Sequence, residues 1–242
     1  MLFKFPQKKI VLDCFTSDHY VIEQSPIDFA IKHIPDWWKN LPTSITNQNN
    51  FAPAPTMKHC VGMVDYYKNS IALPLWSDLA IRVNQNKSYN WKFSNSNTQA
   101  VVHPINEQAT GFLNNYGHLK ISSPWYLKSE KNIDWVWSHP TYNYAHNNDI
   151  VSLPGIVNYY HQHATNINIM ISLEKEKTIL IPHSQPLVIM TPMSDRKIKI
   201  VHHLVSQQEL NKMKNPNITF LQRYKNSIKA RERFSSCPFH KK

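Results

Sequence analysis

The sequence predicts a mainly β protein, folded as a single β-sandwich or barrel with a short N-terminal helix and C-terminal helices. Apolar residues alternate with polar ones at period two along several short segments, which is typical of strands with one buried face. Clusters of Asn, Ser and Pro separate these segments at the spacing of a sandwich or barrel. With 242 residues, 41% hydrophobic and 18% charged, the chain can bury one large core.

The N-terminal part is predicted to begin with an extended segment. Residues 1–24 have the character of a strand, centred on residues 9–12. Ser25 followed by Pro26 then predicts the start of a short helix, because Ser is a favourable N-cap and Pro suits the first helical position. The adjacent Trp37 and Trp38 are expected to separate, one under a turn and the other at a surface groove. Residues 43–56 are polar and Pro-rich, as in a loop.

Residues 58–205 carry the β pattern. Residues 71–83 hold one or two strands, residues 84–99 a polar hairpin, and residues 140–149 a loop rich in Asn and His. Residues 1–205 are therefore expected to form one β-rich domain. Period-two alternation is clearest at Ile133, Trp135 and Trp137, at Ile167, Ile169, Ile171 and Leu173, and at Ile198 and Ile200.

Residues 206–242 are predicted to form a basic helical extension packed on this domain. Ser206 and Glu209 form a capping-box pattern, and the helix that it begins runs to about Lys214. Residues 218–233 form a second, amphipathic helix, which either packs on the β core with its charged face in water or docks on an acidic partner. Its basic surface comprises Arg223, Lys225, Lys229, Arg231 and Arg233.

The chain is strongly basic. Lys and Arg total 27 against 16 Asp and Glu, a formal charge of +11, which favours an acidic protein surface, a phosphate or a nucleic acid as partner. The alternative is an ordinary solvated surface in a chain from AT-rich coding DNA, as the many Asn, Lys and Ile residues indicate. Only four glycines are present, which argues against a Gly-rich phosphate loop.

Cysteine spacing and apolar runs bear on the compartment. Cys14, Cys60 and Cys237 lie far apart with no CxxC pair, so neither a disulfide framework nor a Cys-rich zinc site is predicted, and a reducing compartment is expected. The N-terminus lacks the apolar core of a secretory signal. No apolar run approaches the roughly 18 residues of a membrane-spanning helix, so no membrane partner is expected.

The densest polar cluster surrounds two histidines. His161 and His163 form an HxH pair, and on a strand both imidazoles would lie on one face. With Glu174 and His183 from neighbouring strands, they would form a metal site like that of a cupin-like barrel, which holds Fe, Mn or Zn. The alternative is that these histidines are ordinary surface or core residues. Fe or Mn is the cofactor that this cluster suggests.

Four stretches resemble a family of uncharacterised proteins encoded by tailed phages, notably T4-like marine phages. They are residues 60–83, residues 121–128 with 137–140, residues 153–158, and residues 181–192, and they include the words SPW and LPGIV. The resemblance implies a phage or phage-derived origin and a β-rich single domain, and with it a place in the host cytoplasm or the virion. It implies no activity.

A second resemblance is to the motif order of trimeric dUTPases and dCTP deaminases. A strand at residues 78–79, then residues 122–124, residues 154–160, and the turn and strand of residues 181–189 follow that order. In that family an Asp positions the attacking water, where this chain has Asn158, and an amide cannot act as a general base at neutral pH. The resemblance implies a β-clip-like fold and a deoxynucleotide pocket near Ser122, Ser123, Asn158 and Tyr160.

These patterns lead to three hypotheses of function. The leading one is a phage-encoded structural or interaction protein without catalytic activity, whose partners are an acidic protein surface, another virion protein or further copies of the chain. The first alternative is a cupin-like, metal-dependent oxygenase or related enzyme that uses Fe or Mn. The second alternative is a dUTPase-like nucleotide-binding protein. Nucleic acid is the weakest of the partners, because most tryptophans alternate like core residues or adjoin prolines.

Overall fold

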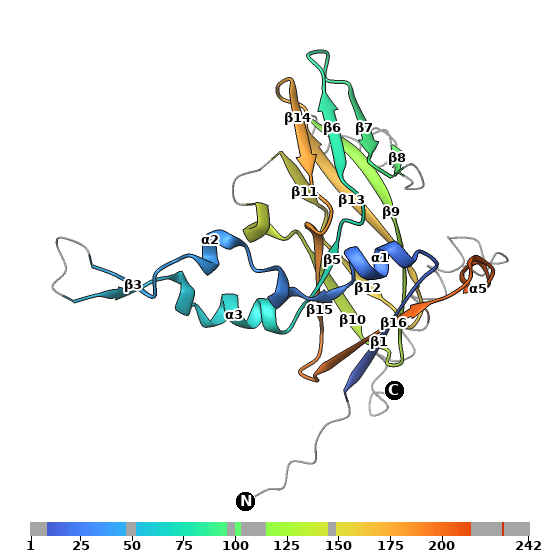
Figure 1. Cartoon of the computed structure of the whole chain (residues 1–242), viewed down its shortest axis with the longest axis horizontal. Helices are drawn as coiled ribbons and strands as arrows, with labels where there is room; N and C mark the ends of the chain where they lie inside the picture. The colour runs from blue at the N-terminus through green and yellow to red at the C-terminus, as the bar shows by residue number, and fades with distance from the viewer. Residues whose placement is uncertain are drawn as a thin grey trace, which may run out of the picture.

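Most of the regular secondary structure belongs to four β-sheets (Figure 1). The computed structural model describes residues 9–46, 52–95, 100–102, 115–144, 149–213 and 229. It is mainly β, with 46% strand and 21% helix, and its few helices are short. The mainly β prediction is confirmed. All four sheets formed by these residues are open, so the barrel alternative is wrong.

The largest sheet has the order β11-β13-β9-β1-β16, and β8 also pairs with β9. β1 and β16 are parallel, whereas the other pairs are antiparallel. The first described strand of the chain and the last therefore lie side by side near one edge. The strands are β1 (Ile10–Thr16), β8 (Ala100–Val102), β9 (Tyr116–Ser129), β11 (Ile150–Ser152), β13 (Ala164–Ser172) and β16 (Ile198–Leu204).

Three further sheets complete the described β structure. The second sheet has the order β12-β10-β15-β5-β2, and β14, β6 and β7 form the third. A small hairpin of β3 (Ser44–Ile45) and β4 (Ala54–Pro55) lies within the segment that was expected to be a loop. The other strands are β2 (Asp28–Phe29), β5 (Ile71–Pro74), β6 (Leu79–Val83), β7 (Tyr89–Phe93), β10 (Asp134–Ser138), β12 (Gly155–Asn158), β14 (Lys177–Ile181) and β15 (Pro186–Pro192).

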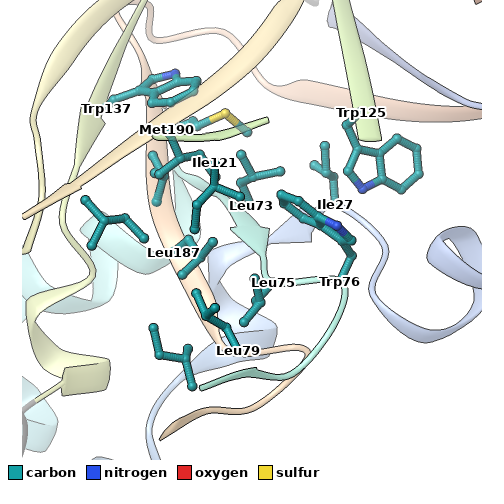
Figure 2. Packing of buried hydrophobic residues seen from close by; sticks show 14 of the residues in the cluster. Ile27, Leu73, Leu75, Trp76, Leu79, Ile121, Trp125, Trp137, Leu187 and Met190 are labelled. Atoms are coloured by element: carbon teal, nitrogen blue, oxygen red, sulfur yellow. The ribbon is translucent and has the colours of Figure 1, made fainter. Parts of the chain in front are cut away.

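One hydrophobic core joins the three larger sheets (Figure 2). Ile121 and Trp125 of β9 enter it from the largest sheet, and Leu73 of β5 and Met190 of β15 enter it from the second. Leu79 of β6 joins it from the third. Each Å² of apolar surface that these side chains remove from water stabilises the fold by roughly 25 cal/mol.

β10 shows the predicted period-two alternation. Trp135 and Trp137 are buried, whereas Val136 between them is 37% exposed. Successive side chains of a strand point to opposite faces, so both indoles enter the core. Trp137 Nε1 also donates a hydrogen bond of 3.0 Å to Tyr159 Oη. The same pattern is confirmed on β13 by the buried Ile167, Ile169 and Ile171.

A helical segment covers part of the outer face of the second sheet and projects away from it with the β3–β4 hairpin (Figure 1). Trp38 and Tyr67 from this segment pack with Ala72 of β5 and Ile189 of β15 in a second hydrophobic cluster. Its helices are α2 (Asp36–Lys39) and α3 (Val61–Lys68), with 3-10 turns at Ala30–His33 and Met57–His59. The helix α3 is a departure from the β pattern expected there. A further 3-10 turn spans Thr141–Tyr144.

The N-terminal helix begins earlier than the sequence predicts. α1 spans His19–Gln24, and its N-cap is Asp18, whose carboxylate accepts a 3.0 Å hydrogen bond from the Tyr20 N–H. Ser25 is its C-cap, so the prediction that Ser25 starts the helix is wrong. Asp and Ser are both good N-cap residues. The position of Asp18 lets Val21 enter the core and leaves residues 28–29 free to pair with β5.

The predicted capping box is confirmed. Ser206 Oγ accepts a 3.2 Å hydrogen bond from the Glu209 N–H, and Glu209 Oε2 accepts a 2.8 Å bond from the Ser206 N–H. The helix α5 that follows spans Gln207–Met213. Of the predicted basic surface, Lys229 is helical and exposed, whereas Arg223, Lys225, Arg231 and Arg233 lie outside the described residues. The domain division at residue 205 stays a prediction.

Among the described residues, no helix combines the length and the apolar character that crossing a membrane requires.

Replacing Trp137 with Ala tests the alternation in β10. The variant is expected to lose about 3–5 kcal/mol of unfolding free energy, because it leaves a large cavity in the core. Val136→Ala is the matched control on the opposite face of the same strand, and it should cost less than about 1 kcal/mol. Urea denaturation of both variants measures these values, and equal costs would show that the strand is assigned to the wrong faces.

Candidate functional site

A polar cleft with a volume of about 720 Å³ opens where several separate parts of the chain meet. Its walls come from β9 and β13, from the connections β1–α1 and β5–β6, and from α5. Cavities of this volume commonly hold small molecules. The side chains that define the polar cleft are Asp18, Trp76, Ser122, Tyr126, Asn166 and Gln207.

Pro124 shapes one wall of the polar cleft. β9 and β13 pair Tyr126 with Ala164 and then Ser122 with Asn166, so a four-residue step on β9 faces a two-residue step on β13. Proline has no N–H to donate to the strand ladder, so an irregularity of this kind is expected at Pro124. Such bulges redirect neighbouring side chains, and this one lies at the cleft.

Side-chain hydroxyls take over hydrogen bonding at the bulge. Ser123 Oγ accepts a 3.1 Å bond from the Trp125 N–H, and Thr165 Oγ1 donates a 2.6 Å bond to the Trp125 carbonyl. Ser123 and Thr165 are both buried, and Trp125 is fully inside the core. The core therefore holds the bulge in place while the neighbouring residues face the cleft.

Hydrogen bonds also fix the polar side chains at the mouth of the cleft. Ser122 Oγ donates to Asn166 Oδ1 at 3.2 Å, and Ser17 Oγ donates to Gln207 Oε1 at 2.8 Å. Gln207 Nε2 in turn donates to Asn211 Oδ1 at 3.1 Å. Each amide has two N–H groups and two lone pairs on its oxygen, so these bonds leave hydrogen-bonding capacity for a ligand.

A second cavity of about 420 Å³ adjoins the polar cleft, and Trp76 and Asn95 line both. Its other side includes Asp78 and His183. Asp78 Oδ1 accepts hydrogen bonds from the His183 backbone N–H at 2.8 Å and from its Nδ1 at 3.3 Å. The backbone bond first, and the side-chain bond second, lower the pKa of Asp78 below its ordinary value. The next residue, Ser184, has a left-handed backbone with φ of 66°.

The charge of the cleft differs from that of the whole chain. Among the described residues that line the two cavities, there are two carboxylates, Asp18 and Asp78, and neither lysine nor arginine. The sequence likewise has no Lys or Arg between Lys92 and Lys120. The described lining therefore carries none of the Lys and Arg behind the net charge of +11, and as described it is poorly suited to hold a phosphate.

The four residues of the predicted metal site do not come together. His161 lies in the turn before β13 and His163 just ahead of that strand, so the expectation that they share a strand face is wrong. His163 Nδ1 lies 2.9 Å from the Leu127 carbonyl oxygen. Glu174 follows the far end of β13, about 30 Å along the strand. Within the part of the chain that the structure describes, no three His, Cys, Asp or Glu side chains are grouped to hold a metal ion.

The predicted nucleotide pocket is split. Ser122 and Ser123 line the polar cleft, whereas Asn158 and Tyr160 do not. Asn158 Nδ2 donates to Asp134 Oδ1 at 2.9 Å, and its Oδ1 accepts from the Tyr160 N–H at 3.1 Å. These bonds fix the turn after β12, and Tyr160 is half-exposed there. The two halves of the predicted pocket therefore belong to different places.

Sequence reasoning missed most residues of the cleft, including Asp18, Trp76, Tyr126 and Gln207. One signal could have pointed to it. Asn166 and Asn168 alternate with the buried Thr165, Ile167 and Ile169, which places both amides on the opposite face from the core. An amide at such a position, paired with a Ser on the neighbouring strand, is an indication of a polar site.

Comparison of the chain with protein-family models, curated proteins and solved structures finds no match. Its function is therefore inferred from the cleft and from the charges around it.

Replacing Asp78 with Asn tests the turn beside the cleft. Because the folded pKa of Asp78 lies below the unfolded value near 3.9, its ionised form stabilises the fold above about pH 4, and this contribution disappears as the pH falls through the folded pKa. Asp78→Asn should therefore melt below the wild type at pH 6, and the gap should close towards pH 2.5.

Melting temperatures of both proteins over this pH range measure the effect. Asp195→Asn, at an exposed position between β15 and β16, controls for a change in overall charge. A gap that stays constant with pH would contradict the role given to the ionised Asp78.

Proposed function

We propose that the protein is a phage-encoded binding protein without catalytic activity, a β-rich interaction module that holds its ligand in the polar cleft. The observation that carries the proposal is the cleft itself, where polar side chains at a β-bulge are held by one another and by the core. Groups whose positions are fixed before binding lose little conformational entropy when a ligand arrives, so they favour binding.

The wider architecture supports an interaction role. Two sheets that share one core are compatible with a sandwich of β-clip-like or cupin-like form, and the open edge strands β12 and β16 offer backbone groups to other chains. The strong positive charge suits an acidic protein surface or another virion protein as partner, and further copies of the chain could pair at the open edges. The protein would act in the virion or the host cytoplasm.

A nucleotide-binding function has one observation in its favour, namely that Ser122 and Ser123 line the cleft. The local charge opposes it. A unit negative charge placed about 4 Å from the Asp18 carboxylate is disfavoured by about 1 kcal/mol even in bulk water, and a triphosphate carries several such charges. The metal-dependent enzyme has no comparable support, because His161, His163, Glu174 and His183 lie apart.

A ligand screen with a blocked cleft tests the proposal. Neutral sugars, nucleotides and peptides are each added to the wild type, to Asn166→Trp, and to Asn90→Trp as a control on the exposed side of β7. One class is expected to raise the melting temperature by about 5–10 °C at a concentration of about 100 times its Kd. The shift should occur in the wild type and the control and be absent from the blocked variant, and the ligand should be recovered unchanged.

Two results would contradict this function. Chemical conversion of the ligand, seen by mass spectrometry, would make the protein an enzyme. A stabilisation that persists in Asn166→Trp would place the binding site outside the polar cleft.

Quantitative mass spectrometry of phage particles from the source tests the virion part of the proposal. A structural role predicts that the protein is present in many copies per particle. Its absence from particles would exclude that role and leave binding in the infected cell.

A further inference from the structure

We infer that the polar cleft takes a neutral, polyhydroxylated ligand, a free sugar or a glycan chain, and that it discriminates against anions. The inference rests on the proposed binding function and names the ligand class for that site. Three properties of the cleft carry it: its charge, its hydrogen-bonding groups and its aromatic side chain Tyr126.

The charge of the cleft excludes the ligands that the whole chain would attract. A protein of charge +11 draws anions to its surface, yet the described lining of both cavities has neither lysine nor arginine. Asp18 in the cleft and Asp78 beside it repel a phosphate, sulfate or carboxylate. A cation finds only these two carboxylates, which lie in different cavities, so a neutral ligand remains the best match.

The hydrogen-bonding groups of the cleft match adjacent hydroxyls. Each hydroxyl of a sugar donates one hydrogen bond and accepts two, so its best partners are groups that both donate and accept. Asn166 and Gln207 are amides with that property, and Ser122 adds a hydroxyl of the same kind. Asn166 and Gln207 are already held through their oxygens by Ser122 and Ser17. The N–H groups of Asn166, and the one N–H of Gln207 that does not donate to Asn211, are therefore oriented to donate to a ligand.

Tyr126 supplies the apolar part of the site, because it lines the cleft and is only partly buried. Trp76 lines both cavities, but it is 4% exposed and packs in the core, so it forms a wall shared by the two and offers no open ring face. A sugar ring has an apolar face of C–H groups as well as polar edges, and an aromatic ring offers a flat apolar surface for that face. Because Trp76 lines both cavities, a chain of more than one sugar unit can pass from the polar cleft towards Asp78 and His183.

The test uses an array that carries neutral oligosaccharides beside their sialylated, sulfated and phosphorylated forms, followed by calorimetry with the neutral oligosaccharide that binds best. The wild type should bind neutral forms in preference to the matched acidic forms. Its Kd should stay the same between low salt and about 0.5 M salt, because no charge pairing is involved. Calorimetry with the corresponding free monosaccharide separates a free-sugar site from a glycan-chain site.

Three single variants locate the ligand. Asn166→Ala and Gln207→Ala should each weaken binding by about threefold to tenfold, the value of one hydrogen bond. Asn90→Ala makes the same type of change on the exposed side of β7, outside the cleft, and should bind like the wild type. A melting curve of each variant confirms that it is folded.

The outcomes separate this inference from the function on which it rests. The inference is overturned if no neutral glycan or sugar binds at millimolar concentration. It is also overturned if the protein prefers the acidic forms, or if Asn166→Ala and Gln207→Ala both leave the binding unchanged. If nucleotides or peptides bind instead and Asn166→Trp abolishes that binding, the ligand class is wrong and the binding function stands. If a neutral glycan binds and is cleaved, the ligand class stands and the non-catalytic function is wrong.

Discussion

Pro124 interrupts β9, the longest of the described strands, at the place where the core and the polar cleft meet. β9 pairs with β13 on one side and with β1 on the other, so its course determines how the largest sheet is arranged. At Pro124 the ladder lacks a donor, and the strand bulges. Trp125 then enters the core, while Ser122 and Tyr126 line the cleft. The cleft is therefore a consequence of how this strand is paired, and it is built on the rigid part of the fold.

The charge of the described cleft lining is opposite in sign to the net charge of the chain. A basic chain whose cleft is lined by a carboxylate, hydroxyls and amides presents two different surfaces to its surroundings. Under the proposed function, long-range attraction would bring acidic surfaces to the protein, whereas the cleft would select its ligand by hydrogen bonding at short range. The two properties are compatible with a protein that is held in an acidic assembly and binds a neutral ligand there.

The sequence predicts the elements whose signal is local and misses those that depend on distant contacts. The alternation of Trp135 and Trp137 and the capping box at Ser206 are confirmed, because period and capping act within a few residues. The helix α3 was missed because its stability comes from Met63 and Tyr67 packing on the second sheet. The HxH pair failed because strand β13 begins one residue after it. The sequence pointed to Ser122 and Ser123, and the pattern around Asn166 could have added a third residue. The rest of the cleft could not be predicted, since its residues span positions 17 to 210 and come together only through the sheet order.

The most direct test of the central claim is a nuclear magnetic resonance titration of the labelled protein with a neutral oligosaccharide. We expect chemical-shift changes that centre on the side-chain amides of Asn166 and Gln207 and on the indole of Trp76. Chemical-shift changes confined to residues away from the polar cleft would contradict binding of a neutral ligand there. So would a titration in which the oligosaccharide changes nothing at saturation while a nucleotide perturbs those three groups.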